Sequence, residues 1–293
     1  MLGTGAAFPD PDRAQSGILV TLNNGATYLF DCGAGTTHNM VRANTNPADV
    51  TAVFLTHLHH DHICDFPLFA ITGWMWDRKM PPIVLGPKGT KNFCNHLFEG
   101  GAFDADFRAR GDYPLRQKNL NAIRPDVREV SPGLAYEDEN VKIYCDYVEH
   151  IPREISECYG IRFEAEGKVI AFSGDTKPCE NMIKLAMDVD ILFHECTFPE
   201  SFIEFRRLSG VGTHAHTSPR ELGEIAAKAK VKKLVATHFG HFESTNQVIK
   251  NAAKNHMPVN EMGPHVMDEV VKDIKNNYDG PLQIAYDLLR IDI

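Results

Sequence analysis

The chain has 293 residues, of which 43% are hydrophobic and 24% are charged, a composition typical of a globular protein. A chain of this length corresponds to one large or two small domains. The net charge of −9 disfavours a broad nucleic-acid-binding surface, and no apolar run of roughly 18 residues is present to cross a membrane.

Short apolar segments predict that the first half of the chain is rich in strands. Residues 17–22 and 26–31 flank Asn23-Asn24-Gly25, a turn sequence that predicts a β-hairpin. Residues 53–56 predict a short buried strand that leads directly into a cluster of histidines. Further strands are expected, in chain order, at residues 82–86, 142–148, 159–164, 169–173, 191–194 and 234–237.

Helical patterns lie between these strands. Residues 219–230 carry apolar side chains at helical spacing, with Ser218 as the N-cap and Pro219 as the first helical residue. Residues 89–97 and 178–186 show similar patterns. Two series of strands, each followed by helices, predict an α+β fold in which two sheets pack together with helices outside, an αββα arrangement.

We expect residues 1–293 to form a single domain with two additions. Residues 100–140 are rich in charge and poor in periodicity, which predicts a lid or insertion. The tail from about residue 257 to residue 293 is expected to be a C-terminal extension. Its pattern predicts one helix at residues 268–276 and one strand at residues 283–293.

A dense group of metal-ligand residue types follows the strand at residues 53–56, in the motif His57-x-His59-x-Asp61-His62. In an extended chain His57 and His59 point the same way, so both imidazoles can reach one ion. The following turn then carries Asp61 and His62 towards a neighbouring ion. Imidazole and carboxylate groups suit zinc and other first-row divalent metals. A polar surface loop is the alternative, which this density of ligands disfavours; the intervening His60 is expected to point away.

Other ligand-type residues stand at the ends of later strands. His150, Asp175 and His238 each follow closely on one of the strands predicted above. Each residue alone would also fit a turn-forming aspartate or a capping histidine. Three strand ends that each supply a metal-ligand type predict instead one shared site at the edge of a sheet. We assign His214 to a loop and His241 to a turn cap.

Taken in order, these motifs resemble the metallo-β-lactamase superfamily over nearly the whole chain. The matching segments are Gly-Thr-Gly at residues 3–5, Leu-Phe-Asp-Cys-Gly at residues 29–33, the His-x-His-x-Asp-His motif, Val-Glu-His150, Ser-Gly-Asp175-Thr and Ala-Thr-His238. The resemblance implies an αββα sandwich of two mixed sheets, with two metal ions at one edge between the sheets. It implies one ion on His57, His59 and His150, a second on Asp61, His62 and His238, Asp175 as a bridge between them, and Asp31 as a support behind the cluster.

Two further segments are similar to ribonuclease Z, the transfer-RNA 3′-end endonuclease of this superfamily. The segment from His194 to Phe198 is similar to that family's His-Glu-Ala-Thr sequence, and His216-Thr217-Ser218 is similar to its His-x-Ser/Thr sequence. In that family the glutamate and the second histidine cooperate in protonating the leaving group. The resemblance implies these roles for Glu195 and His216. The alternative is that Glu195 is a buried structural carboxylate and that His216 caps the following helix.

The chain departs from ribonuclease Z in the parts that handle RNA. Residues 9–16 form an acidic loop where that family carries a Pro-x-Lys-x-Arg-Asn sequence, and acidic side chains suit a phosphate backbone poorly. No long Gly/Lys-rich arm lies between the first histidine motif and His150. Trp74 and Trp76 lie just downstream of the motif, either in the core or in the wall of an apolar small-molecule pocket. Within the superfamily, the chain is therefore similar to ribonuclease Z and to the related arylsulfatase-like enzymes, without the RNA-handling parts.

These residues predict a metal-dependent hydrolase in which a hydroxide that bridges two ions attacks the substrate. Asp61 would orient this nucleophile or take its proton, and His216, oriented by Glu195, would protonate the leaving atom. Our main hypothesis is a small-molecule ester, lactone, amide, sulfate ester or phosphodiester as substrate. The alternative is a ribonuclease Z-type endonuclease that processes transfer-RNA 3′ ends. A binding or redox protein is disfavoured because the hydrolase ligand set is complete.

Zinc fits the His/Asp ligand set best, with manganese and iron as the alternatives. The expected partners are a small-molecule substrate and a second copy of the chain, since homodimers are common in the family. A transfer-RNA precursor is disfavoured by the charge, and no membrane partner is expected. Seven scattered cysteines without a Cys-x-x-Cys spacing, and no signal peptide, favour the cytoplasm. Residues 1–5 resemble the end of a strand, which would also fit a chain whose leader has been removed.

Overall fold

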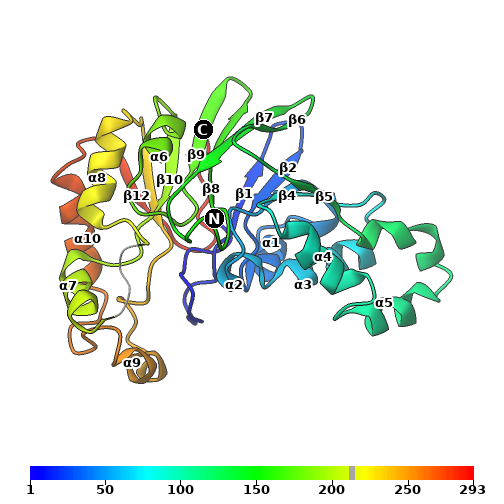
Figure 1. The fold of residues 1–293 in the computed structure, drawn as a ribbon, viewed down its shortest axis with the longest axis horizontal. Helices are drawn as coiled ribbons and strands as arrows, with labels where there is room; N and C mark the ends of the chain where they lie inside the picture. The colour runs from blue at the N-terminus through cyan, green and yellow to red at the C-terminus, as the bar shows by residue number, and fades with distance from the viewer. Residues whose placement is uncertain (211–214) are drawn as a thin grey trace.

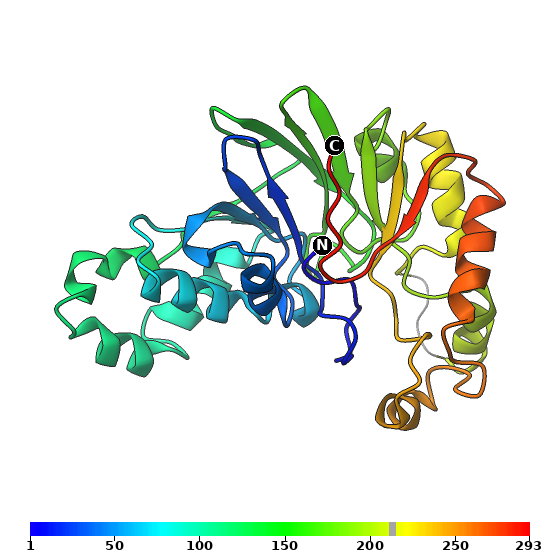
Figure 2. The same cartoon turned by 180° about the vertical axis from the view of Figure 1, so that it is seen from behind.

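The computed structural model describes residues 1–210 and 215–293, so His214 lies outside the described residues. Two mixed β-sheets pack face to face, and helices cover the outer face of each sheet (Figures 1 and 2). This arrangement confirms the predicted αββα fold.

The N-terminal sheet has five strands in the order β1-β2-β3-β4-β5. β1 and β2 form the predicted antiparallel hairpin, in which Gly25 adopts a left-handed φ of 90° at the turn. All other neighbours in this sheet are parallel. The strands are β1 (Ile18–Thr21), β2 (Thr27–Phe30), β3 (Val50–Phe54), β4 (Ile83–Gly86) and β5 (Asp126–Glu129).

The second sheet has seven strands in the order β12-β11-β10-β9-β8-β7-β6. The strands from β6 to β9 form an antiparallel meander, and β9, β10, β11 and β12 run parallel to one another. The strands are β6 (Gly133–Glu137), β7 (Val141–Tyr147), β8 (Tyr159–Ala165), β9 (Lys168–Phe172), β10 (Ile191–Glu195), β11 (Leu234–Thr237) and β12 (Leu282–Ile284).

The helices are short, and none of those in the described part of the chain is long and apolar enough to cross a membrane. In α8, Ser218 is the N-cap and Pro219 the first helical residue, as the sequence predicts, and Ser218 also forms a capping box with Glu221. The α-helices are α1 (Thr36–Arg42), α2 (His60–Ile63), α3 (Phe66–Met75), α4 (Thr90–Phe98), α5 (Asp104–Gly111), α6 (Glu180–Leu185), α7 (Glu200–Leu208), α8 (Pro219–Lys228), α9 (Gln247–Ala253) and α10 (Val266–Lys275), and the 3₁₀ helices are Pro47–Asp49, Arg116–Lys118 and Leu120–Ile123.

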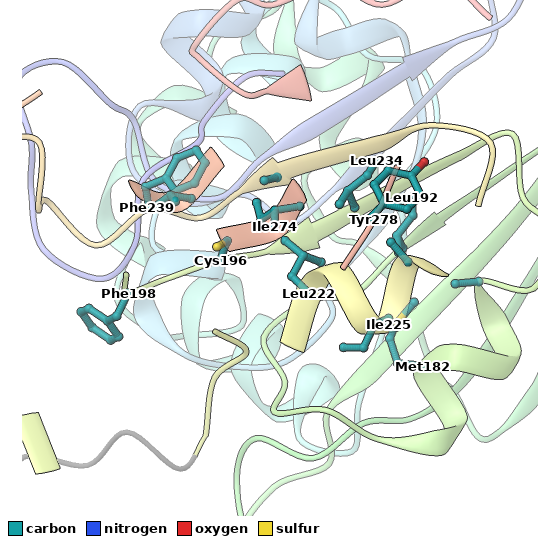
Figure 3. Close-up of a cluster of buried hydrophobic side chains, with 14 of the residues drawn as sticks. Met182, Leu192, Cys196, Phe198, Leu222, Ile225, Leu234, Phe239, Ile274 and Tyr278 are labelled. Carbon is teal, nitrogen blue, oxygen red and sulfur yellow. The ribbon is translucent and has the colours of Figure 1, made fainter. Parts of the chain in front are cut away.

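Three hydrophobic clusters hold these layers together. Between the sheets, the rings of Phe30 and Phe172 stack with their centroids 4.2 Å apart. Outside the first sheet, buried side chains of α1, α3 and α4 pack on β3 and β4. Outside the second sheet, Leu222 of α8 and Ile274 of α10 pack on β10 and β11 (Figure 3). The core therefore fixes the two sheets relative to each other close to the edge that carries the candidate ligands.

The segment at residues 100–140, expected to be a lid or insertion, contains α5, two 3₁₀ helices, β5 and β6. The first sheet ends at β5 and the second at β6. Most of this segment's helical part projects at one end of the molecule, where Figure 1 shows α5.

The prediction of a strand over residues 283–293 is wrong for most of its length. β12 ends at Ile284, and Leu288 adopts a left-handed φ of 65° that an extended strand does not allow. The tail instead binds the start of the chain, because the Met1 amino group donates to the Leu289 carbonyl at 2.7 Å. The apolar side chains of this tail, such as Ala285 and Leu289, therefore pack in the core and not in a strand.

We expect Leu222→Ala to lower the free energy of unfolding by about 2–5 kcal/mol, because this side chain is fully buried between α8 and the second sheet. Urea denaturation monitored by circular dichroism measures the change. Leu208→Ala is the matched control, since Leu208 is 72% exposed and its loss leaves no cavity. Equal losses in both variants would contradict the assigned packing of α8.

Candidate metal centre

The candidate ligands gather where parallel strands of both sheets end. His57 and His59 follow β3, Asp175 follows β9, and His238 follows β11. The carboxyl ends of parallel strands share one edge of a sheet, so residues far apart in the sequence meet there. His238 has a left-handed φ of 61°, which marks the sharp turn of the chain after β11.

The short helix α2 carries Asp61 and His62 into the same edge, where both side chains are buried. His60, between the two metal-motif positions His59 and Asp61, leaves 67% of its side chain exposed. Its Nε2 lies 2.9 Å from the carbonyl oxygen of Ala7. His60 therefore points away from the cluster, as the sequence predicts.

The ligand atoms form two clusters that share one carboxylate, and the ligand atoms within each cluster lie within 4.8 Å of one another. Asp175 Oδ2 is 3.7 Å from His150 Nε2, and Asp175 Oδ1 is 3.2 Å from His238 Nε2. The first cluster consists of His57, His59, His150 and Asp175, and the second of Asp61, His62, Asp175 and His238. These groupings are the two ligand sets that the resemblance implies.

Unpaired polar atoms show that the clusters suit cations. Within the described residues, His57 Nε2, His62 Nε2 and Asp175 Oδ1 are buried and have no hydrogen-bond partner. His59 Nδ1 and His150 Nε2 face each other at 3.0 Å. Buried acceptors without partners are costly, and a divalent cation would satisfy these atoms together. The donor set of imidazoles and carboxylates therefore fits divalent metals.

Two buried groups of the clusters, His57 and Asp175, are in the protonation state that a metal ligand needs. Burial lowers the pKa of His57 well below its ordinary value, so this ring is neutral and offers a lone pair. Burial raises the pKa of Asp175, but the neighbouring His238 and His62 outweigh it and hold that pKa well below its ordinary value. The shared carboxylate is therefore ionised, as a bridging ligand must be.

Asp31 lies behind the first histidine motif and orients it. Its carboxylate accepts hydrogen bonds from the backbone N–H of Thr56 at 2.8 Å and from His62 Nδ1 at 2.7 Å. The Thr56 hydroxyl lies 3.0 Å from the same carboxylate and 3.1 Å from His57 Nδ1. With Nδ1 engaged in this way, each ring presents Nε2 to the cluster.

A carboxylate–histidine pair adjoins the second cluster. Glu195 ends β10, and its Oε1 lies 2.9 Å from His216 Nδ1, in the loop before α8. Burial lowers the pKa of His216, but the Glu195 carboxylate outweighs this effect and raises the pKa to about 9. Glu195, His216 and His238 place their ligand-type atoms within 4.8 Å of one another. A protonated imidazole thus stands beside the candidate metal centre.

Trp74 lies in the core, one of its two expected places, and His241 and Trp76 lie outside the ligand clusters. The buried Nδ1 of His241 lies 3.0 Å from Asp10 Oδ2 and ties the N-terminal loop to the turn after β11. Trp74 is fully buried, and Trp76 lines a cavity of about 420 Å³ with Val50, at the opposite end of β3 from His57. Neither tryptophan therefore walls the candidate metal centre.

The sequence motifs include neither Thr56 nor Asp10 as a partner of these histidines. Thr56 directly precedes the histidine motif, so its position was the available signal. Asp10 gave no such signal, because its partner lies 231 positions away in the chain.

A family model, curated relatives and solved structures each match most of the chain. The family model described as Anti-Pycsar protein Apyc1 matches residues 1–258. Ribonuclease Z of Exiguobacterium sibiricum is 32% identical over 285 residues, covering 81% of this chain and 86% of the relative. The crystal structure of the short form of human tRNase Z has 21% identity and a TM-score of 0.68, covering 99% of this chain and 97% of that one. The metallo-β-lactamase fold protein YhfI from Bacillus subtilis has 20% identity and a TM-score of 0.68, covering 98% and 95%.

The two clusters predict different zinc contents for the wild-type chain and for two variants. We expect about two zinc ions per wild-type chain, about one in His59→Ala, and almost none in Asp175→Ala, because the two clusters share only Asp175. Elemental analysis after dialysis against zinc measures the content. His60→Ala is the matched control and should keep the wild-type content, since His60 points away from the clusters. Equal zinc loss in His60→Ala and His59→Ala would contradict the ligand assignment.

Proposed function

This chain belongs to the Anti-Pycsar protein Apyc1 family within the ribonuclease Z branch of the metallo-β-lactamase superfamily of hydrolases, and we propose that it hydrolyses phosphodiester bonds. The observation that carries this proposal is the Glu195–His216 pair beside the second ligand cluster. A phosphodiester releases an alkoxide, which is a poor leaving group unless it is protonated as the bond breaks. A hydrolase of this bond therefore gains from a proton donor next to its metals.

We propose that the metal centre holds two zinc ions. One ion would be held by His57, His59 and His150, a second by Asp61, His62 and His238, and Asp175 would be shared by both. When bound, the ions would lower the pKa of water to supply hydroxide near neutral pH and would stabilise negative charge on the phosphoryl oxygens. Manganese and iron remain the alternatives that the ligand types allow.

Asp61 and His216 would act in different proton transfers, one at the attacking water and the other at the leaving oxygen. Asp61 Oδ2 lies 3.3 Å from His238 Nε2, within the second cluster, where a carboxylate can orient the attacking water or accept its proton. His216 Nδ1 faces Glu195, which leaves Nε2 free to donate a proton to the leaving oxygen. Glu195 would hold the ring in this orientation and stabilise its charged form.

A transfer-RNA precursor is the first candidate substrate. The relatives named ribonuclease Z favour a transfer-RNA precursor over an unspecified small molecule as substrate. The Glu195–His216 pair, which the same resemblance singled out, is assembled in the structure. These two observations support cleavage at the 3′ end of an RNA precursor.

A small phosphodiester is the second candidate, and the charge of the chain favours it. The net charge is −9, and the N-terminal loop next to His60 carries the exposed Asp12, while Asp10 in the same loop is buried against His241. An RNA backbone that approached this side would meet negative side chains, which weakens long-range attraction. A small substrate with one phosphodiester avoids most of this repulsion.

We also propose a cytoplasmic location, which the scattered cysteines favour, and a homodimer, which the resemblance implies. All seven cysteines are free in the structure, as a reducing compartment would require.

Replacement of the proposed proton donor should affect substrates according to their leaving group. We expect His216→Ala to slow hydrolysis of a ribonucleotide phosphodiester by about 10²–10⁴-fold, because its leaving alkoxide needs a proton. A p-nitrophenyl phosphodiester, whose phenolate leaves without protonation, should be slowed far less. Steady-state kcat/KM on both substrates measures the difference. Equal losses on the two substrates would show that His216 has a structural role only.

The substrate class can be tested with a panel of esters and a transfer-RNA precursor. We expect phosphodiesters to be hydrolysed with higher kcat/KM than sulfate esters, lactones or carboxylic esters. On the precursor, kcat/KM should fall by about tenfold or more between about 50 and 200 mM salt, because RNA binding releases counterions. A faster and salt-insensitive reaction on a dinucleotide would favour the second candidate. Preferred hydrolysis of a lactone or sulfate ester would overturn the phosphodiesterase proposal.

A further inference from the structure

The hydroxyl of Thr197 stands between the proposed proton donor and a candidate metal ligand. Its Oγ1 lies 2.7 Å from Glu195 Oε2, 3.1 Å from His238 Nδ1 and 3.2 Å from His216 Nδ1. Thr197 is only 2% exposed, so water does not compete for these contacts. The hydroxyl therefore connects two histidines and a carboxylate that come from three separate segments of the chain.

The direction of these hydrogen bonds follows from the number of protons available. An ionised carboxylate can only accept, so the single hydroxyl proton of Thr197 points to Glu195 Oε2, its shortest contact. His216 Nδ1 lies closer to Glu195 Oε1, at 2.9 Å, and donates to that oxygen. A lone pair of Thr197 Oγ1 is then free to accept a hydrogen bond from the protonated Nδ1 of His238.

This direction fixes the tautomer and the orientation of His238. With Nδ1 protonated and bound to Thr197, Nε2 carries the lone pair. His238 Nε2 lies 3.2 Å from Asp175 Oδ1 and 3.3 Å from Asp61 Oδ2, inside the second cluster. The hydroxyl thus holds the ring with its ligand atom directed to the metal centre.

We propose that Thr197 is a positioning residue for His238, and that Glu195 acts through it on the second metal cluster as well as directly on His216. The first cluster shows the same design, because the Thr56 hydroxyl connects His57 Nδ1 to the Asp31 carboxylate. The inference rests on the proposed metal centre and concerns metal affinity, which is measured without any substrate.

The test is the zinc affinity of Thr197→Val, titrated against a chromogenic chelator. Valine keeps the side-chain shape but removes the hydroxyl, so His238 loses its orienting partner. We expect the affinity for one of the two zinc ions to fall by about 10–100-fold, as when other orienting partners of metal ligands are removed. The affinity for the other ion should stay unchanged, because His57, His59 and His150 do not touch Thr197.

Three further variants separate this role from packing and from proton donation. Thr197→Ser keeps the hydroxyl and should restore the wild-type affinity. Thr237→Val is the matched control, since Thr237 is also buried, directly precedes His238, and its hydroxyl has no hydrogen-bond partner in the described residues. His216→Ala should leave zinc affinity unchanged while it slows hydrolysis, which separates a failure of the proposed proton donor from a failure of this inference.

Two results would overturn the role of Thr197 in positioning His238. Unchanged zinc affinity in Thr197→Val, or an equal loss in Thr237→Val, would show that the hydroxyl does not position His238. A Thr197→Ser variant as weak as Thr197→Val would assign the effect to packing. Thermal unfolding of the metal-free variants shows whether each one is folded before titration. If Thr197→Val is unfolded, the zinc affinity of Thr197→Ser alone tests the role of the hydroxyl, and a value below that of the wild type contradicts the inference.

Discussion

A single buried carboxylate shared by two groups of imidazoles constrains the rest of this site. Asp175 belongs to both ligand clusters, and it follows a strand of the second sheet while the histidine motif follows a strand of the first. Its burial is tolerable only with positive charge on both sides. The preceding Gly174 has a left-handed φ of 56°, and a β-carbon there would lie 3.0 Å from Thr56 Cβ. The two sheets must therefore meet closely at this edge, which the aromatic core between them ensures.

Two further carboxylates, one from each sheet, hold the rings around this centre. Asp31 follows β2 in the first sheet and orients His57 and His62, the former through the hydroxyl of Thr56. Glu195 ends β10 in the second sheet and pairs with His216. The candidate ligands His57 and His62, and the neighbouring His216, are thus held by buried hydrogen bonds, which limits the movement of the rings.

The same ligand set serves hydrolases with different substrates, because metals supply the reactive water while the surrounding loops contact the rest of the substrate. In this chain those surroundings include the N-terminal loop that Asp10 ties to His241 and that Ala7 ties to His60. Both ties bring this loop to the edge of the candidate metal centre. The loops around the candidate ligands, including this N-terminal loop, are therefore where a substrate would make its remaining contacts.

The sequence alone determined the features that depend on neighbouring residues. The hairpin at Gly25, the capped helix α8 and the pairing of ligand types in His57-x-His59-x-Asp61-His62 are local patterns with local causes. The order of the motifs also predicted the αββα fold. The tertiary structure alone decided what depends on long-range contacts: the end of β12 against the N-terminus, the burial of Trp74, and the hydrogen bonds that Thr197 and Asp10 make to histidines 41 and 231 positions away. A hydroxyl or a carboxylate has no spacing rule that reveals a distant partner, because that partner is set by the packing of whole sheets.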